Sequence, residues 1–223
     1  MSRRGRARAD GETRLTGVPD AAPNGAVNLP RSVVLVEGAS DRVALHTLAG
    51  RLGRDLEVEG VRVVAMGGIT NTSAFATRYG PRGLGLPLAG LYDTPEEPLL
   101  RRGLAAAGLA EALEPHGPER MGFYGCSTDL EDELIRALGT DGVEAVIDAA
   151  GEAQSLRLLA GMPAQRGWTR EAVLRRFLGS RSGRKARYAA LLVSALDPEQ
   201  VPEPLAAVLG HVERDGRPPR VRG

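Results

Sequence analysis

The sequence has little cysteine and few aromatic residues. Cys126 is its single cysteine, which excludes an intrachain disulfide and a thiolate cluster for zinc. Aromatic residues make up 4% of the 223 residues, which argues against an extended platform that stacks bases. The interior is therefore expected to be packed mainly with aliphatic side chains.

Net charge and long apolar segments are also missing. The 29 basic and 28 acidic residues leave a formal charge of +1, so any binding of nucleic acid must be local or bridged by metal ions. No apolar run approaches the roughly 18 to 20 residues of a membrane span, and the arginine-rich start lacks the apolar segment of a secretory signal. We expect a soluble, cytoplasmic protein without a membrane partner.

Composition divides the chain into four segments. Residues 1–30 are rich in Arg, Gly and Pro and lack apolar periodicity, which predicts a disordered basic arm. Residues 31–142 alternate β-branched runs with helical patterns, which predicts an α/β core. Residues 143–212 have mostly helical patterns, and residues 213–223 resemble the arm in composition, so a helical C-terminal part and a disordered tail are expected.

Four strands are expected in the α/β core. The runs that predict them lie at residues 33–36, 61–66, 86–92 and 121–126, and helical patterns follow several of them. Strands that alternate with helices imply βαβ units and right-handed crossovers. The predicted fold is therefore α/β, a mostly parallel Rossmann-like sheet flanked by helices, with a helical C-terminal extension.

Acidic residues follow three of these strands. Glu37 follows the first, Asp93 the third, and Asp129 with Glu131 the fourth, while Asp41 lies one helical turn beyond Glu37. Ligands of an open α/β sheet bind beyond the carboxyl ends of its strands, so these side chains are expected to converge. Mg²⁺ and Mn²⁺ prefer such hard oxygen ligands. The pattern predicts a carboxylate site that holds Mg²⁺ or Mn²⁺, and the expected number of ions is two.

Some of these carboxylates have a structural alternative. Asp41 and Asp132 lie where helices begin, and the helix dipole favours negative charge there with or without a metal. Glu37 has no such explanation, because it directly follows a buried strand and precedes a glycine. Both interpretations stay open for Asp41, and capping is the simpler one for Asp132.

A basic segment near the C-terminus contains Arg184, Lys185 and Arg187. Two cations between the carboxylates and a phosphodiester would neutralise the attacking and leaving oxygens. Lys185 is then predicted to contact the phosphate or the leaving oxygen, and the two arginines to hold flanking phosphates. Taken alone, Lys185 is more typical of a solvated helix, so its assignment depends on the resemblance that follows.

Several segments together resemble the TOPRIM domain of the OLD (overcoming lysogenization defect) family of ATP-dependent endonucleases. Residues 33–41 resemble its first motif, with a second acid four positions after the glutamate, and residues 67–71 resemble its glycine turn. Residues 91–93 stand where its Asp-x-Asp motif begins. Residues 128–131 and 183–189 are similar to its next acidic segment and its late lysine segment.

The resemblance implies a stand-alone TOPRIM-type endonuclease whose catalytic residues are Glu37, Asp93 and Lys185. The implied metal ligands are all carboxylates, and they are Glu37, Asp41, Asp93, Glu96, Asp129 and Glu131. The implied substrate is DNA, with RNA as an alternative. A separate polypeptide would supply any ATPase activity, because the chain has no G-x-x-x-x-G-K-[ST] phosphate loop. The sequence leaves a homodimer open.

One departure from the family pattern concerns the second aspartate of Asp-x-Asp. Pro95 stands in its place, and Glu96 is expected to replace it only in part. The alternative function is therefore a catalytically degenerate TOPRIM subunit that binds DNA or regulates a partner. Topoisomerase or primase chemistry ranks lower, because the four tyrosines have no strand-gating apparatus around them. A phosphatase of the haloacid dehalogenase type would need the aspartate that Pro95 replaces.

Overall fold

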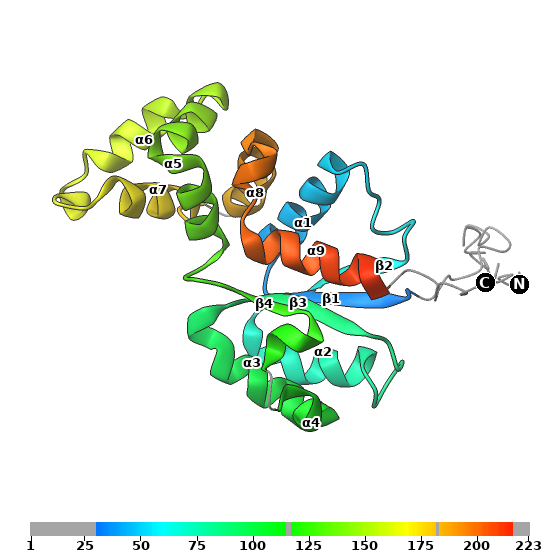
Figure 1. Ribbon diagram of the computed structural model, residues 1–223. Coiled ribbons are helices and arrows are strands. Elements are labelled where there is room, and N and C mark those ends of the chain that lie inside the picture. Colours follow the sequence, from blue (N-terminus) through cyan, green and yellow to red (C-terminus); the bar gives the residue numbers. More distant parts are fainter. Residues whose placement is uncertain (1–29, 115–116, 182, 216–223) are drawn as a thin grey trace, which may run out of the picture.

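The computed structural model describes residues 30–114, 117–181 and 183–215, and its centre is a four-stranded parallel sheet (Figure 1). The strands run in the order β2-β1-β3-β4, and they are β1 (Ser32–Val36), β2 (Val61–Ala65), β3 (Leu88–Asp93) and β4 (Phe123–Cys126). The predicted fold class, a parallel α/β sheet flanked by helices, is thus confirmed. Apart from Pro30, the predicted basic arm lies outside the described residues.

Nine α-helices surround the sheet in this part of the chain. They are α1 (Ala39–Arg51), α2 (Thr72–Tyr79), α3 (Glu97–Leu104), α4 (Ala110–Leu113), α5 (Leu130–Ala149), α6 (Ala153–Ala160), α7 (Arg170–Leu178), α8 (Arg184–Ala195) and α9 (Glu203–Asp215). None of these described helices is long and apolar enough to cross a membrane.

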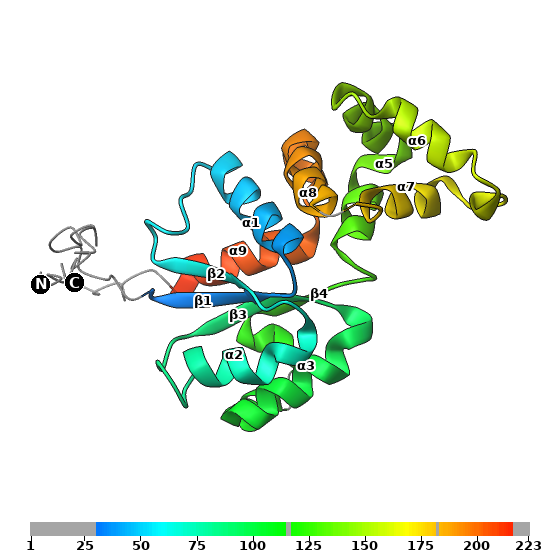
Figure 2. The same cartoon turned by 180° about the vertical axis from the view of Figure 1, so that it is seen from behind.

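Helices cover both faces of the sheet, as the view from behind also shows (Figure 2). Side chains alternate between the faces of a strand, so Val33 and Leu35 point to one side of β1 and Val34 and Val36 to the other. The first pair packs in a core with α2 and α3, and the second in a larger core with α1, α5, α8 and α9. All four side chains are fully buried, which explains the unbroken apolar run in the sequence.

The helical C-terminal part divides into two groups (Figures 1 and 2). Helix α5 breaks at Gly139, whose φ of 70° and ψ of 160° are not helical, and its second half forms a lobe with α6 and α7. Helix α8 returns to pack on α1, and α9 packs on β3 and β4. The division at residue 142 stays a prediction. Residues 213–215 continue α9, and residues 216–223 of the predicted tail lie outside the described chain.

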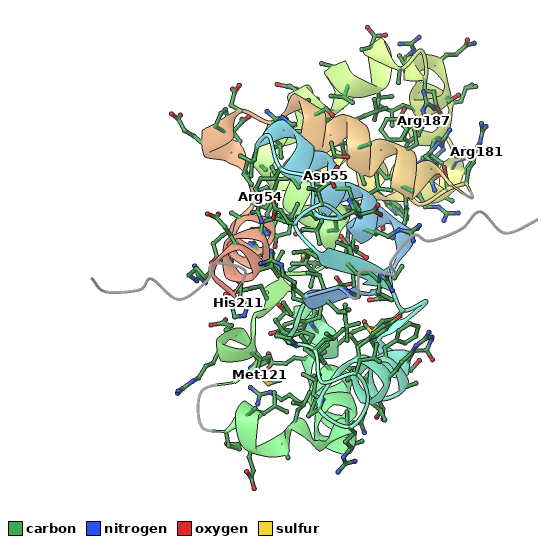
Figure 3. All side chains as sticks on the ribbon, turned by 90° about the vertical axis from the view of Figure 1, so that its right-hand side faces the viewer. Arg54, Asp55, Met121, Arg181, Arg187 and His211 are labelled. Carbon is green, nitrogen blue, oxygen red and sulfur yellow. The ribbon has the colours of Figure 1, made fainter. Side chains whose placement is uncertain are left out.

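Arg54, in the loop after α1, fastens α9 to the rest of the molecule (Figure 3). Its guanidinium forms an ion pair with Glu59 at 2.6 Å and donates a hydrogen bond to the carbonyl of Leu209 at 3.0 Å. Only 15% of the Arg54 side chain is exposed, so the pair is shielded from water. The last helix is thereby held against the sheet, beside the strands that end at the site described next.

Candidate metal centre

Three carboxylates meet at the carboxyl edge of the sheet. Glu37 follows β1, Asp93 is the last residue of β3, and Glu96 ends the short 3₁₀ turn η2 (Thr94–Glu96). Because β1 and β3 are neighbouring parallel strands, their ends share one edge. One carboxylate oxygen from each residue lies within 4.8 Å of the other two. The structure thus brings Glu37 and Asp93 together as the sequence predicted.

Glu96 joins this group through the geometry of the 3₁₀ turn. Such a turn has three residues per turn, so side chains three positions apart lie on the same side. Asp93 precedes η2 and Glu96 lies three positions later, so both carboxylates return to the same place. Pro95 lies in the first turn, where its missing N–H is not needed. Glu96 was expected to replace the missing aspartate only in part. In the structure it is the third carboxylate of the group.

The backbone of Glu37 is held by the glycine turn after β2. The N–H groups of Gly67 and Gly68 both donate to the carbonyl oxygen of Glu37, at 2.9 and 3.2 Å. The φ angles of these glycines are 74° and 123°, a conformation that side chains disfavour. The glycine turn noted in the sequence therefore positions the end of β1.

Burial and crowding disfavour the charged forms of Glu37 and Asp93. Burial first, then contact with Glu96 and the charges of Asp93 and Asp41, raise the pKa of Glu37 to about 7. Burial, together with the charges of Asp41, Asp129 and Glu96, raises the pKa of Asp93 to about 7. Oε2 of Glu37 and Oε2 of Glu96 are buried without a hydrogen-bond partner in the described chain. Unpaired carboxylate oxygens at this spacing fit a hard divalent cation such as Mg²⁺ or Mn²⁺.

The three carboxylates adjoin a cleft of about 340 Å³. The charged residues that line it are Glu37, Asp41, Asp93, Asp129, Glu131 and Lys185. All the carboxylates predicted from the sequence other than Glu96 therefore border one opening, although the compact group of three does not include Asp41, Asp129 or Glu131.

Asp41 and Glu131 each have one oxygen engaged. Oδ2 of Asp41 accepts a hydrogen bond from the N–H of Gly38 at 2.7 Å, which is the capping role considered for it. Burial, despite that bond, and the charge of Glu131 raise the pKa of Asp41 to about 6. Glu131 is buried, and its Oε2 accepts from Nζ of Lys185 at 2.9 Å, while its Oε1 has no partner in the described chain. Asp41 and Glu131 thus each accept a hydrogen bond within the protein and also line the cleft.

Asp129 has both oxygens engaged. Oδ1 accepts from the N–H of Asp132 at 2.8 Å and so caps α5, and Oδ2 pairs with Arg175 of α7 at 2.5 Å. Asp132, which was expected to favour a helix N-terminus, lies in the first turn of α5 and forms an ion pair with Arg136 at 3.2 Å. Asp129 therefore begins the helix, and its availability to a metal is lower than that of Glu131.

The basic segment presents two faces of α8. Lys185 points to the cleft, with its side chain half exposed, and the hydrogen bond and charge of Glu131 raise its pKa although partial burial lowers it. Arg184 is buried, lies 4.1 Å above the Phe177 ring and pairs with Glu152. Arg187, three positions after Arg184, pairs with the same glutamate at the outer surface (Figure 3). Arg184 thus has a structural position, and only Lys185 of the three faces the carboxylates.

Sequence reasoning missed the contribution of α7. Arg175 holds Asp129, and Trp168 and Arg176 line a hollow that also includes Lys185. No motif marks these residues. The helical spacing of 172, 175 and 176, which places them on one face of α7, is the signal that could have found the two arginines.

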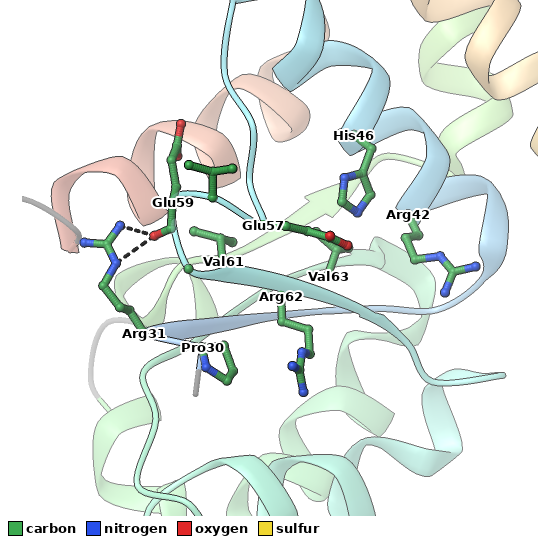
Figure 4. A pocket seen from close by; sticks show the side chains of 11 residues that line it. Pro30, Arg31, Arg42, His46, Glu57, Glu59, Val61, Arg62 and Val63 are labelled. Carbon is green, nitrogen blue, oxygen red and sulfur yellow. Dashed lines mark hydrogen bonds between the residues drawn. The ribbon is translucent and has the colours of Figure 1, made fainter. Parts of the chain in front are cut away.

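A larger cavity, of about 570 Å³, borders the amino-terminal part of β2 (Figure 4). Arg42 and His46 of α1 face Arg62 across it, and Arg31 donates to the carbonyl of Glu59 at 2.7 Å. Its charges are mixed and its carboxylates do not form a close group with a third ligand among the described residues. Chemistry and not size therefore favours the cleft beside Glu37, Asp93 and Glu96 as the candidate site.

Comparisons with known proteins bear on the family and the fold of the chain. Residues 30–94 match the family model described as "Overcoming lysogenization defect protein-like, TOPRIM domain". The chain is similar to the C-terminal region of the Xanthomonas campestris pv. campestris OLD protein, at 26% identity and a TM-score of 0.62, covering 84% of this chain and 96% of that one. The C-terminal region of the Burkholderia pseudomallei OLD protein is 22% identical, with a TM-score of 0.61, and the match covers 84% of this chain and 99% of that one. At this identity the likeness is one of fold alone. No curated protein matches the sequence.

Proposed function

Because residues 30–94 carry an OLD-like TOPRIM domain, we propose that the protein hydrolyses phosphodiester bonds of nucleic acid with divalent cations held at its carboxylate cleft. The observation that carries the proposal is the group formed by Glu37, Asp93 and Glu96, in which one carboxylate oxygen of each residue lies within 4.8 Å of the other two. DNA is the proposed substrate and Mg²⁺ or Mn²⁺ the proposed cofactor. A separate ATPase chain in the cytoplasm is the proposed partner.

The three carboxylates would hold the first cation. Once bound, such a cation supplies Lewis-acid stabilisation of phosphate charge and acidifies a water molecule. Glu37 and Asp93, with pKa values near 7, retain protons near neutral pH unless a cation displaces them. Asp41 and Glu131, which also line the cleft, are the proposed ligands of a second cation.

Lys185 is the proposed contact to the reacting phosphate. Its Nζ is held by Glu131 at 2.9 Å, so its charge is kept at the mouth of the cleft. A fixed ammonium that faces the place where negative charge develops stabilises the transition state without reorganisation. Arg175 is bound to Asp129, which caps α5, and is proposed to keep the start of α5 in place without touching the substrate.

Cleavage of supercoiled plasmid tests the proposal. The full chain is expected to nick the plasmid with Mn²⁺ or Mg²⁺ and not with EDTA. Glu37→Gln and Asp93→Asn are each expected to lower the nicking rate by at least about a hundredfold, because each removes a charged ligand while keeping its shape, on the order of 2.7 kcal/mol of the barrier.

Glu111→Gln is the matched control. Glu111 is an exposed residue of α4, remote from the cleft, and its substitution is expected to leave nicking unchanged. Equal nicking by the wild type and both cleft variants would identify a contaminating nuclease and refute the proposal. Full binding of DNA with no nicking at any cation concentration would favour the non-catalytic subunit instead.

A further inference from the structure

The exposed face of α7 forms a hollow beside the carboxylate cleft. The residues of α7 that line the hollow are Ala172, Arg175 and Arg176, which have the spacing of one helix face, while Trp168 lies just before the helix and Gly179 directly after it. They line a hollow of about 390 Å³, named here the α7 groove. The α7 groove shares Asp129, Glu131 and Lys185 with the cleft, so the two are continuous.

The α7 groove is lined by both small and large residues. Ala172 and Gly179 contribute little side-chain bulk, while Trp168, Arg175 and Arg176 are its large members. The opposite face of α7 is buried in the core through Leu174 and Phe177, so the helix cannot turn its groove face inward. The α7 groove is therefore a fixed feature of the surface.

Trp168 is unusual in its exposure. It is the single tryptophan of the sequence, and 46% of its surface is accessible to solvent. A large aromatic ring is normally buried, because leaving it in water forfeits much of the hydrophobic effect. An exposed indole beside positive charge suits a ligand with a flat apolar part, since indole rings stack on other rings.

The charges beside Trp168 suit an anion. Arg176 is exposed and forms no hydrogen bond or ion pair with any residue that the structure describes, so its guanidinium is available. Arg175 is half exposed and is held by Asp129 at 2.5 Å. A nucleotide combines the two properties that the α7 groove matches, a flat base and a negative phosphate.

We propose that the α7 groove binds an unpaired nucleotide of the strand whose phosphodiester lies at the carboxylates, with its base on Trp168 and its phosphate on Arg176. This inference deepens the proposed function and rests on it for the position of the scissile bond. The base must be unpaired, because a paired and stacked base has no free face to offer an indole. Lys185, which borders both openings, lies where the strand passes from one to the other.

Fluorescence of the single tryptophan tests the inference without catalysis. The full chain is titrated with single-stranded oligodeoxythymidylate of about ten nucleotides, in EDTA so that no cleavage occurs. We expect saturable quenching of Trp168 emission that weakens with added salt. The same oligonucleotide annealed to its complement is expected to quench less.

Variants then locate the contacts, with affinity measured by polarisation of a labelled oligonucleotide. Trp168→Ala is expected to weaken binding about five- to a hundredfold, Trp168→Phe to weaken it less, and Arg176→Ala to weaken it severalfold with a shallower salt dependence. Arg157→Ala is the matched control, because Arg157 is an exposed arginine of α6 outside the α7 groove. Circular dichroism confirms that each variant is folded.

The outcomes separate this inference from the proposed function. If Trp168→Ala and Arg176→Ala bind the oligonucleotide as tightly as the wild type, the α7 groove is not its binding site, even if the protein nicks plasmid. If duplex quenches Trp168 emission as strongly as the single strand, the claim that the bound base is unpaired is wrong. Quenching by an acidic peptide and not by the oligonucleotide overturns a nucleic-acid ligand in favour of a protein. Quenching with the expected variant effects, in a protein that never nicks, supports the α7 groove while the hydrolytic function fails.

Discussion

Pro95 and Glu96 show how a turn alters a motif at the scale of single residues. A proline at the position of an expected aspartate suggests a lost ligand as long as positions are counted along the sequence. The 3₁₀ turn changes this, because it brings the residue three positions after Asp93 back to the same side. Glu37 and Asp93 could be predicted because each directly follows a strand, whereas the place of Glu96 depends on a turn type that the residues alone do not dictate.

Substitution of Glu96 tests its part in cation binding. Glu96→Gln is expected to weaken Mn²⁺ binding by at least about tenfold, or about 1.4 kcal/mol, because a neutral amide replaces a charged ligand. Titration calorimetry measures the affinity. Glu97→Gln is the matched control, because Glu97 pairs with Arg101 at 2.6 Å and lies outside the group. Equal Mn²⁺ affinity in Glu96→Gln and the wild type would mean that Glu96 is not a ligand and that only Glu37 and Asp93 of the group hold the cation.

Asp129 and Arg184 mark the limit of residue-level reasoning. Asp129 lines the cleft, as expected, but its oxygens cap α5 and pair with Arg175, while Arg184 is buried against Phe177. Capping and ion pairing use the same chemical groups as metal or phosphate binding. Residue type therefore could not distinguish these roles, and only the partner found in space does so.

At the scale of elements, the glycine turn after β2 acts on the site through the backbone. The turn binds the carbonyl of Glu37 with two N–H groups, and Gly68 does so at a φ of 123°. Gly68→Ala is expected to destabilise the fold by about 1 to 3 kcal/mol, because a side chain is strained in this conformation. Urea denaturation followed by circular dichroism measures the change.

Gly50→Ala is the control for that prediction. Gly50 lies inside α1, has open space where the methyl group of an alanine would lie, and does not have a positive φ. Alanine favours a helix interior over glycine, so the change is expected to be neutral or stabilising by about 0.5 to 1 kcal/mol. Similar losses in both variants would mean that the turn after β2 has no special conformational demand.

Strands and helices were not equally predictable. Apolar runs predicted all four strands, most clearly β1, whose β-branched residues are buried on both faces, and most weakly β4. The helical patterns of residues 143–212 predicted α6, α7 and α8 as a group, whereas α3 was not predicted. Pro98 lies in the first turn of α3, where it is tolerated, but a proline also breaks helices and its position in a turn is unknown from the sequence.

For the whole molecule, the site joins the sheet to the helices that follow it. Lys185 of α8 reaches Glu131 of α5, and Arg175 of α7 reaches Asp129. The packing of α8 on α1 and of α9 on β3 and β4 could not be predicted, because an amphipathic pattern shows which face is buried and not what buries it. The long-range ion pairs are therefore a result of the fold and not of any motif.

The raised pKa values of Glu37 and Asp93 predict how stability changes with pH. Near pH 4 both groups hold protons in the folded chain, and above about pH 7 the folded chain must carry buried negative charge. The folded state binds more protons than the unfolded chain between these values, so stability without metal is expected to fall as pH rises from about 4 to 7. Thermal unfolding in EDTA across this range measures the trend.

Asp93→Asn is the control for this dependence. Asparagine stays neutral, so the variant is expected to match the wild type near pH 4 and to exceed its stability at pH 8 in EDTA. Saturating Mn²⁺ should reverse that order at pH 8, because only the wild type keeps a charged ligand. A variant less stable than the wild type at pH 8 in EDTA would show that Asp93 is not destabilised by its surroundings.

Diffraction from crystals grown with Mn²⁺, recorded at a wavelength where manganese scatters anomalously, tests the central claim most directly. The predicted result is an anomalous peak at the carboxyl edge of the sheet, about 2.0 to 2.2 Å from one oxygen of each of Glu37, Asp93 and Glu96. A saturated crystal with no peak there, or with manganese bound only by other residues, would contradict a metal centre at these carboxylates.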